Sequence, residues 1–465
     1  MPTFRDDFLW GVAAASFQIE GATDQGDRGD SVWDLFCRWP GKVKHGDDGS
    51  VACDHYHRYA EDADLIQDLG AGAYRLSVAW PRVMPQGVGQ VNEAGLAFYD
   101  RLVDALLERG VQPWVTLYHW DLPTALHHRG GWLNADIPRW FGDYTRAVVE
   151  RLSDRVSNWF TLNEPACFVG LGYDTGEQAP GLKLSRPDVL RCWHHALLAH
   201  GEAVRVIREH ARTPPRVGAA PVGKAPFPAT DEPADVEAAR HATFAYEPTG
   251  WWPWNQAMIG DPAILGQYPE DFLAAVGHEL PAGWESQMPA IREPLDFYGM
   301  NLYNDRAVVA DGSQPTGARP IASVVGAAST HIGWPVSPDM MYWGPKFIHE
   351  RYGLPIYITE NGLASMDWVH ADGGVHDTGR VDFLTRYLTR LRDAANDGVD
   401  LAGYFHWSIL DNFEWAEGYS KRFGLVHVDF QTQKRTPKDS YHHYAGIIAS
   451  NGGSLPDGTA LPPLE

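Results

Sequence analysis

One repeated pattern limits what this chain can fold into: an amphipathic stretch ends near a glycine, and a short run of β-forming residues follows. The glycines and the runs after them are Gly70 and 73–78, Gly110 and 114–117, Gly353 and 356–359, and Gly398 and 401–405. A glycine directly after a helix supplies the left-handed backbone of a C-terminal cap. An apolar run without alternation is typical of a strand buried on both faces. The pattern therefore predicts helices that alternate with parallel strands.

Further strand candidates fill the gaps between these units, at residues 8–15, 158–162, 216–221 and 297–301. Eight strands separated by helices, with no polar linker to divide the 465 residues, predict a single α/β domain with a (β/α)8 barrel over about 8–444. An open doubly wound sheet is the alternative. No glycine-rich phosphate loop follows the first strand to support that alternative.

Two segments lack a clear helix or strand pattern. Residues 213–294 are rich in proline and tryptophan and weakly periodic, so we expect long loops over the C-terminal face of the barrel, with room for a small insert. Residues 451–465 are expected to form a loose C-terminal tail.

Charge and composition narrow the possible partners. The chain carries 38 Lys and Arg against 60 Asp and Glu, which gives a formal net charge of −22. Such a charge repels phosphate backbones and anionic lipids, so neither nucleic acid nor a membrane surface is an expected partner. Tryptophan is frequent, with 19 residues. Its flat apolar face suits stacking on sugars, although most of these rings are expected in the core.

Other features concern the location of the protein. The first residues lack a basic segment followed by an apolar one, and no run of about 18 apolar residues occurs, so we expect neither a secretory signal nor a membrane span. The cysteines, at positions 37, 53, 167 and 192, show neither close pairing nor metal-type spacing. Reduced thiols in a cytoplasmic protein are the expected state. The sequence carries no indication of oligomeric state.

In a barrel of this kind, functional side chains lie where the strands end. Seven of the eight predicted strands are followed by polar or aromatic residues, which in strand order are Gln18 and Glu20, Arg75, His119 and Trp120, Asn163 and Glu164, Asn301 and Tyr303, Glu360, and His406 and Trp407. A barrel built only for stability does not require this pattern. We therefore expect a functional site at this face.

Two of these residues, Glu164 and Glu360, follow the fourth and seventh strands and should face each other across the barrel mouth. Two carboxyl groups about 5–5.5 Å apart are typical of a retaining glycosidase, and a gap of about 6.5–9.5 Å is typical of an inverting one. A single strand-end glutamate is more often a capping or ion-paired residue. The pattern alone leaves these alternatives open.

Several motifs, in order, resemble those of family 1 of the glycoside hydrolases, the β-glucosidase family. The sequences Thr-Leu-Asn-Glu-Pro at 161–165 and Ile-Thr-Glu-Asn-Gly at 358–362 carry the two glutamates. The other matching motifs lie at 8–13, 18–21, 54–59, 118–123 and 410–415. The resemblance covers residues 8–444. It implies a (β/α)8 barrel enzyme. Phosphate-loop and nucleotide-binding signatures are absent from the sequence, so no cofactor is expected.

The resemblance also implies a catalytic role for each glutamate. Glu360 is expected to attack the anomeric carbon, and Glu164 to protonate the leaving oxygen and then to activate water, so that configuration is retained. Arg75 and Tyr303 match the neighbours that keep the nucleophile ionised. Glu164 then needs a raised pKa, which the nearby charge of Glu360 favours.

A second set of residues matches the positions that hold the sugar in this family. Asn163 is the expected contact to the 2-hydroxyl, Trp407 the floor under the ring and Trp334 a wall for the leaving group. The full set implied by the resemblance is Gln18, His119, Trp120, Asn163, Asn301, Trp334, Trp407, Glu414, Trp415 and Phe423.

The chain departs from its relatives at several informative positions. Relatives that cleave 6-phosphosugars have Ser where Glu414 stands and Tyr where Phe423 stands, so phosphosugars are not expected substrates. Many family members have Trp at the position of Ala166, which implies a thinner wall for the leaving group. Cys167 is interpreted as a small apolar filler. His55 begins a motif with metal-type spacing, but it opens a helix and lacks partner ligands, so no metal is expected.

The expected function is hydrolysis, with retention, of terminal non-reducing β-D-glucosyl residues from short oligosaccharides and glucosides. A broad β-glycosidase that also accepts galactosides or fucosides remains an alternative, as does transfer of the sugar to an acceptor. A non-catalytic carbohydrate-binding barrel is a more distant alternative, because a binding protein has no use for the carboxylate pair.

Overall fold

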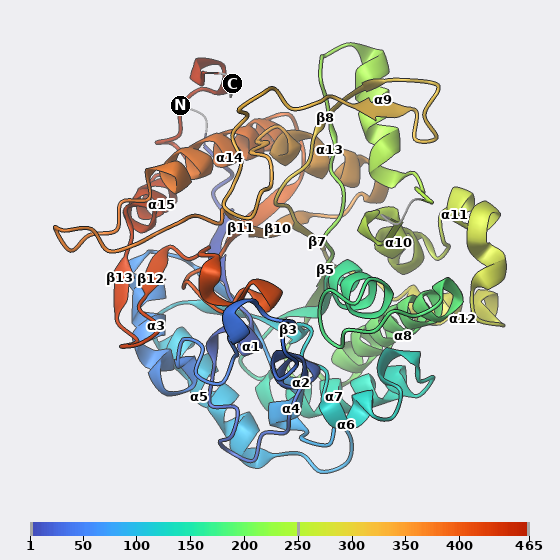
Figure 1. Cartoon of the computed structure of the whole chain (residues 1–465), viewed down its shortest axis with the longest axis vertical. Helices are drawn as coiled ribbons and strands as arrows, with labels where there is room; N and C mark the ends of the chain where they lie inside the picture. Colours follow the sequence, from blue (N-terminus) through green and yellow to red (C-terminus); the bar gives the residue numbers. More distant parts are fainter. Residues whose placement is uncertain (1–2, 249–251, 463–465) are drawn as a thin grey trace.

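The computed structural model describes residues 3–248 and 252–462. Eight parallel strands form its central sheet, in the spatial order β5-β4-β3-β2-β1-β11-β10-β7 (Figure 1). Their bounds are β1 Leu9–Ala13, β2 Ala73–Ser77, β3 Gln112–Tyr118, β4 Asn158–Asn163, β5 Arg216–Ala220, β7 Tyr298–Asn301, β10 Ile356–Asn361 and β11 Leu401–Trp407. Each overlaps a strand predicted from the sequence.

Hydrogen bonds carry the sheet around into a barrel. Strand β1 pairs with both β2 and β11, so that Val12 lies opposite Tyr74 on one side and His406 on the other. At the far edges, β5 and β7 approach each other, and the N–H of Asn301 donates to the carbonyl of Pro221 at 3.0 Å. The predicted (β/α)8 barrel is therefore confirmed.

Helices surround the barrel (Figure 1). The α-helices of eight or more residues are α3 His55–Asp68, α5 Glu93–Glu108, α7 Ile137–Leu152, α8 Arg186–His210, α9 Pro233–Phe244, α12 Trp284–Ile291, α13 Met340–Tyr352, α14 Thr378–Asn396 and α15 Asp439–Ala449. Shorter helices are α1 Ser16–Ile19, α2 Val32–Cys37, α4 Trp80–Val83, α6 Thr124–His127, α10 Ala257–Gly260 and α11 Glu270–Val276. Short strands outside the barrel are β6 Phe227–Pro228, β8 Ala307–Ala310, β9 Ala318–Pro320, β12 Val426–Val428 and β13 Arg435–Pro437.

The four glycines of the repeated pattern end helices as predicted. Gly70, Gly110, Gly353 and Gly398 have φ of 82°, 73°, 66° and 92°. L-residues with a side chain rarely adopt these angles, so glycine is the least strained residue at each turn. Each turn directs the chain from an outer helix back into a strand of the barrel.

The lower part of the barrel interior is filled by aromatic rings. Trp114 of β3 lies 5.7 Å, centroid to centroid, from Phe160 of β4 and 4.8 Å from Tyr357 of β10. Gly218 of β5 makes room for this layer, because a Cβ there would overlap the ring of Phe297. The guanidinium of Arg75 lies 5.0 Å from the Phe160 ring. The aromatic layer therefore closes the barrel beneath the polar residues that follow it.

Two predictions about irregular segments need correction. The stretch 213–294, expected as loops, contains α9, α10, α11 and α12. These helices are short, with 4 to 12 residues, so most of them do not fill the window over which helical periodicity can be recognised.

The expected loose tail is instead held against the N-terminal segment and α14. The Nδ2 of Asn451 donates to the carbonyl of Phe4 at 2.9 Å, and Arg392 donates to the carbonyl of Leu455 at 3.1 Å. Leu455 itself is buried. Contacts with residues distant in sequence hold this segment, and local sequence patterns do not reveal them.

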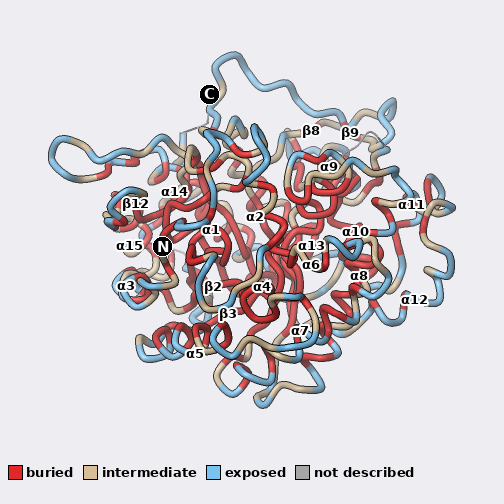
Figure 2. Tube along the Cα trace, turned by 60° about the horizontal axis from the view of Figure 1, so that its bottom comes forward, coloured by how far each residue is buried: buried red, intermediate tan, exposed pale blue. Residues whose placement is uncertain are grey.

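The central strands are buried and the exposed residues lie on the outer loops and helix faces (Figure 2). Among the described residues, no helix is both long enough and apolar enough to cross a bilayer.

Candidate active site

A cavity of about 1020 Å³ opens at the C-terminal ends of the strands. It collects side chains from loops that are distant in sequence, as expected for a barrel of this type. The predicted site residues that line it are His119, Trp120, Glu164, Tyr303, Trp334, Glu360, Trp407, Glu414, Trp415 and Phe423. The other predicted residues, Gln18, Arg75, Asn163 and Asn301, are buried and hydrogen-bonded to members of this set or to one another.

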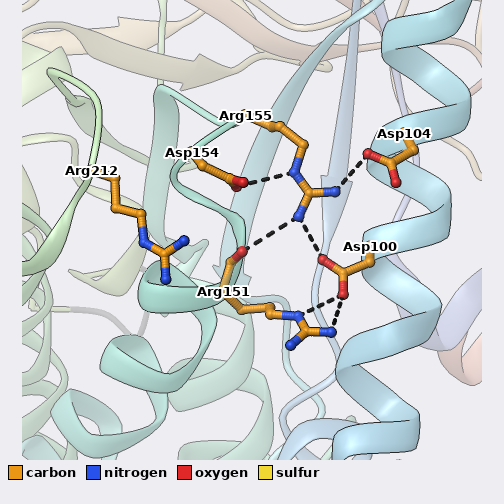
Figure 3. Close-up of a pocket in the computed structure, with 6 residues that line it drawn as sticks. All are labelled: Asp100, Asp104, Arg151, Asp154, Arg155 and Arg212. Carbon is orange, nitrogen blue, oxygen red and sulfur yellow. Dashed lines mark hydrogen bonds and ion pairs between the residues drawn. The ribbon is translucent and has the colours of Figure 1, made fainter.

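A smaller hollow of about 390 Å³ is lined by charged side chains, several of which pair with one another (Figure 3). Arg155 donates to Asp100 and Asp104, each at 2.6 Å, and to Asp154 at 3.0 Å. Arg151 donates to Asp100 at 2.6 Å. These acidic and basic groups balance one another and join α5 to the end of α7, so the larger cavity is the candidate active site.

Glu360, at the end of β10, has two partners that favour its ionised form. Arg75 donates from Nη1 to Oε1 at 2.6 Å, and Tyr303 donates its hydroxyl to Oε2 at 2.5 Å. Burial raises the pKa of the Glu360 carboxyl, and the Arg75 charge and the Tyr303 hydrogen bond oppose that rise. This carboxylate therefore has the charge compensation that a buried anion needs.

Glu164, directly after β4, has only uncharged partners. Asn301 donates from Nδ2 to Oε1 at 2.6 Å, and the Cys167 thiol donates to Oε2 at 3.0 Å. Burial, together with the charge of Glu360, raises the pKa of Glu164 to about 8. The two glutamates thus share one cavity but differ in their preferred protonation state, as a pair with separate acid and base roles requires.

A network of hydrogen bonds fixes the groups between the strands. Asn163 accepts at Oδ1 from Arg75 Nη2 at 2.6 Å and from Asn301 Nδ2 at 3.0 Å. Its own Nδ2 therefore donates to Nε2 of His119, at 3.0 Å. Burial and the Arg75 charge lower the pKa of His119 well below its usual value, so the ring is neutral and carries its hydrogen on Nδ1.

Two groups of aromatic rings line the cavity. In one group, the ring centroids of Trp120 and Trp415 lie 4.4 Å apart, and His119 stacks at 5.7 Å from Trp407. In the other group, the rings of Trp334, Tyr303 and Phe423 contact one another, with centroid distances of 5.3 to 6.2 Å. Flat rings of this kind can stack on the apolar faces of a sugar.

A third carboxyl group, that of the half-buried Glu414, faces the same cavity. Burial and the charges of Glu360 and Glu164 raise its pKa to about 8. Gln18 lies beside it and donates from Nε2 to the carbonyl of Phe413 at 2.9 Å. The Oε1 of Gln18 is buried and has no hydrogen-bond partner among the described residues. This end of the cavity therefore combines donors and acceptors suited to hydroxyl groups.

The site geometry agrees with the comparison to known proteins. A family model of glycosyl hydrolase family 1 matches residues 1–453. The chain belongs to glycosyl hydrolase family 1. Beta-glucosidase A of Thermotoga maritima is 43% identical over 453 residues, which cover 97% of this chain and 98% of that protein. A beta-glucosidase of Agrobacterium sp. is 42% identical over 450 residues, 96% of this chain and 95% of that protein.

Solved structures of family 1 members share the fold. The beta-glucosidase of Thermotoga maritima in complex with glucoimidazole matches with a TM-score of 0.89 at 43% identity, covering 97% of this chain and 100% of that chain. The same enzyme in complex with galacto-hydroximolactam also matches with a TM-score of 0.89, with the same identity and coverage.

Some residues of this family 1 site were not expected from the sequence. Cys167 is not an inert filler, because its thiol contacts Glu164 and lines the cavity. Ala166 is fully buried and is not among the residues that line the cavity. Val222 and Lys224 line the cavity after β5, the strand for which no site residue was predicted. Their position just after a predicted strand is the sequence feature that could have identified them.

His55, the first residue of the histidine motif, is buried and lies beside a carboxyl group. His55 Nδ1 lies 2.8 Å from Asp62, which also accepts from Arg435 at 2.9 Å. Within residues 3–248 and 252–462, no group of three or more His, Cys, Asp or Glu side chains is arranged to hold a metal ion.

Proposed function

We propose that this family 1 protein is a retaining β-glucosidase that removes terminal non-reducing β-D-glucosyl residues from short oligosaccharides and glucosides. The observation that carries the proposal is the contrast between two buried carboxyl groups in one cavity. Glu360 has Arg75 and Tyr303 as partners, whereas Glu164 has only uncharged donors and a pKa raised to about 8. One group is therefore suited to act as nucleophile and the other as acid.

In the first step, a Glu360 carboxylate oxygen bonds to the anomeric carbon as the bond to the leaving oxygen breaks. Glu164 transfers its proton to that oxygen, and the sugar becomes an ester of Glu360. The negative charge of Glu360 is lost in this ester. The charge that helped to raise the pKa of Glu164 is then absent, so its ionised form becomes more stable.

In the second step, ionised Glu164 takes a proton from water as the water oxygen attacks the anomeric carbon. The ester bond breaks, Glu360 regains its charge and Glu164 regains its proton. Two displacements at the same carbon restore the β configuration. Each group returns to its starting state, and the chemistry draws only on the two glutamates and water.

The remaining predicted residues are proposed to hold the sugar. Asn163 is assigned to the 2-hydroxyl, Trp407 to the lower face of the ring and Trp334 to the leaving group. The unpaired Oε1 of Gln18 and the carboxyl group of Glu414 offer partners for hydroxyl groups at the inner end of the cavity. The further sugar-binding residues of this proposal are His119, Trp120, Asn301, Trp415 and Phe423.

We also propose that residues 1–465 act as one catalytic unit located in the cytoplasm. The unpaired state of all four cysteines supports a reducing compartment.

A panel of nitrophenyl glycosides tests the proposed function. Release of nitrophenol should be fastest from unphosphorylated β-glycosides, with the β-glucoside first, and far slower from the α-glucoside and the 6-phospho-β-glucoside. A dominant rate on the 6-phosphosugar would contradict the assignments of Glu414 and Phe423. If folded protein releases no nitrophenol from any glycoside of the panel, a carbohydrate-binding function without catalysis would be favoured.

A broader β-glycosidase is the second candidate. The related Thermotoga maritima enzyme has been solved with galacto-hydroximolactam, a ligand named for the galacto configuration. Comparable rates on the β-galactoside or β-fucoside in the same panel would favour this candidate. Measurement of glucose against total nitrophenol, with added sugar acceptor, would separate hydrolysis from transfer.

A further inference from the structure

A thiol lies directly against the carboxyl group of Glu164. The Sγ of Cys167 is 3.0 Å from Oε2 of Glu164, and Cys167 is only 5% exposed although it lines the cavity. The N–H of Cys167 donates to the Glu164 carbonyl at 2.9 Å, at the start of the helical segment η3 (Ala166–Asp174). This turn after β4 brings residues 164 and 167 close together, and their side chains meet at the Sγ–Oε2 contact.

The other oxygen of Glu164, Oε1, already accepts a hydrogen bond from Asn301. The amide of Asn301 donates one hydrogen to Oε1 of Glu164 and the other to Oδ1 of Asn163, while its own oxygen accepts from Thr359 at 2.6 Å. This amide cannot turn into an acceptor without losing those bonds. A proton on Glu164 is consequently favoured at Oε2, the oxygen that faces the thiol.

We propose that Cys167 is a positioning residue for the acid/base reaction of Glu164. Its thiol donates to Oε2 when Glu164 is ionised, and it turns away when that oxygen carries the proton for the leaving group. The proton passes from Oε2 to the glycosidic oxygen, and the thiol hydrogen remains on sulfur throughout. This inference rests on the proposed role of Glu164 as acid and base.

The chemistry of a thiol suits this position. Burial and the charges of Glu164 and Glu360 raise the pKa of Cys167 well above its usual value, so the thiol keeps its hydrogen. An S–H group is a weak donor. It therefore gives the carboxylate a partner without lowering the pKa of Glu164 as far as a hydroxyl group would.

Substitutions of Cys167 should move the pH profile in opposite directions. The measurement is kcat/KM for an aryl β-glucoside whose leaving group needs protonation. The fall of kcat/KM at high pH follows the pKa of the acid, Glu164. Cys167→Ala removes the donor and should move this limb upward by about half a pH unit, and Cys167→Ser should move it downward by about the same amount. Both substitutions leave in place the charged and titratable side chains around Glu164, which are Arg75, His119, Tyr303, Glu360 and Glu414.

Cys192→Ala is the matched control, because Cys192 is fully buried in α8 and does not line the cavity. Its pH profile should coincide with that of the parent. If the limbs of both Cys167 variants also coincide with the parent, or move in the same direction, the proposal is wrong. A purely structural role would lower stability without this opposite pair of shifts.

The parent enzyme provides a second measurement that does not depend on the folding of any variant. The infrared S–H stretching band of one thiol should move to lower frequency as Glu164 ionises, with the same pKa as the alkaline limb of kcat/KM. The absence of any S–H band that follows this pKa would overturn the proposal. Failure of the parent to hydrolyse any β-glycoside would instead overturn the proposed function, whatever the thiol shows.

Discussion

Arg75 reaches from β2 through the barrel interior to Glu360 on β10, and its Nη1 lies 2.6 Å from Oε1 of the glutamate. The same nitrogen donates to the carbonyl of Thr359 at 2.9 Å, and Nη2 donates to Asn163 at 2.6 Å. Both Arg75 and Glu360 are almost completely buried. One guanidinium thus compensates the carboxylate proposed as nucleophile and also orients a neighbouring residue on β4.

The first prediction concerns this ion pair. In Arg75→Met, the charge that opposes the burial of Glu360 is lost, so the pKa of Glu360 should rise. Activity that requires ionised Glu360 is lost as pH falls through this pKa, and the acidic limb of kcat/KM should therefore move to higher pH by about 1 to 3 units. Arg151→Met, in the surface network of Figure 3, is the control and should leave the limb in place. An unchanged acidic limb in folded Arg75→Met would contradict the assignment.

The second prediction tests the nucleophile. Glu360→Gln keeps the shape of the side chain but removes the attacking carboxylate, so turnover of an aryl β-glucoside should fall on the order of 10⁴-fold or more. Thermal unfolding should show that the variant is folded. Glu61→Gln, on the exposed face of α3, is a control for the chemical change and should keep the parent rate. Hydrolysis by Glu360→Gln at the parent rate would show that another group attacks the sugar.

The third prediction separates the two roles of Glu164. In Glu164→Ala, substrates with good leaving groups should still form the glycosyl-enzyme, because their departure does not need a proton. The second step lacks its base, and added azide should restore turnover by attacking the ester directly. The product, identified by NMR, should be the β-glycosyl azide. Recovery of the α-azide would contradict a double displacement.

The fourth prediction follows from the raised pKa of Glu164. The acid must be protonated, so kcat/KM should decline as pH rises through about 8. The same limb should disappear when the residual activity of Glu164→Ala is assayed with the same substrate. A limb that persists in this variant would have to arise from another group, such as Glu414, whose pKa is also raised to about 8.

The parts of the fold that local sequence predicts are those with local causes. A glycine such as Gly70 or Gly398 is required by a positive φ at the end of a helix, and the cause lies within a few residues. An unbroken apolar run such as residues 401–405 of β11 follows from burial on both faces. These signals were sufficient for all eight strands and for the barrel.

Other features depend on contacts between distant segments. The short helices α10 and α11 have too few residues for a clear period, and the docking of Asn451 against Phe4 joins opposite ends of the described chain. Nothing in the sequence indicates that the Cys167 thiol contacts Glu164 rather than filling the core. The two residues come together because the chain turns directly after β4, and that turn forms only in the folded barrel.

The sequence by itself determined the order of helices and strands, the motifs at the strand ends and the resemblance to family 1, because periodicity, caps and motifs are properties of neighbouring residues. The tertiary structure alone decided the environment of each glutamate. Arg75 compensates Glu360, while Asn301 and Cys167 leave Glu164 without a positive partner. Burial and charge depend on groups from β2, β4, β7 and β10, and only barrel closure brings those groups within a few ångströms of one another.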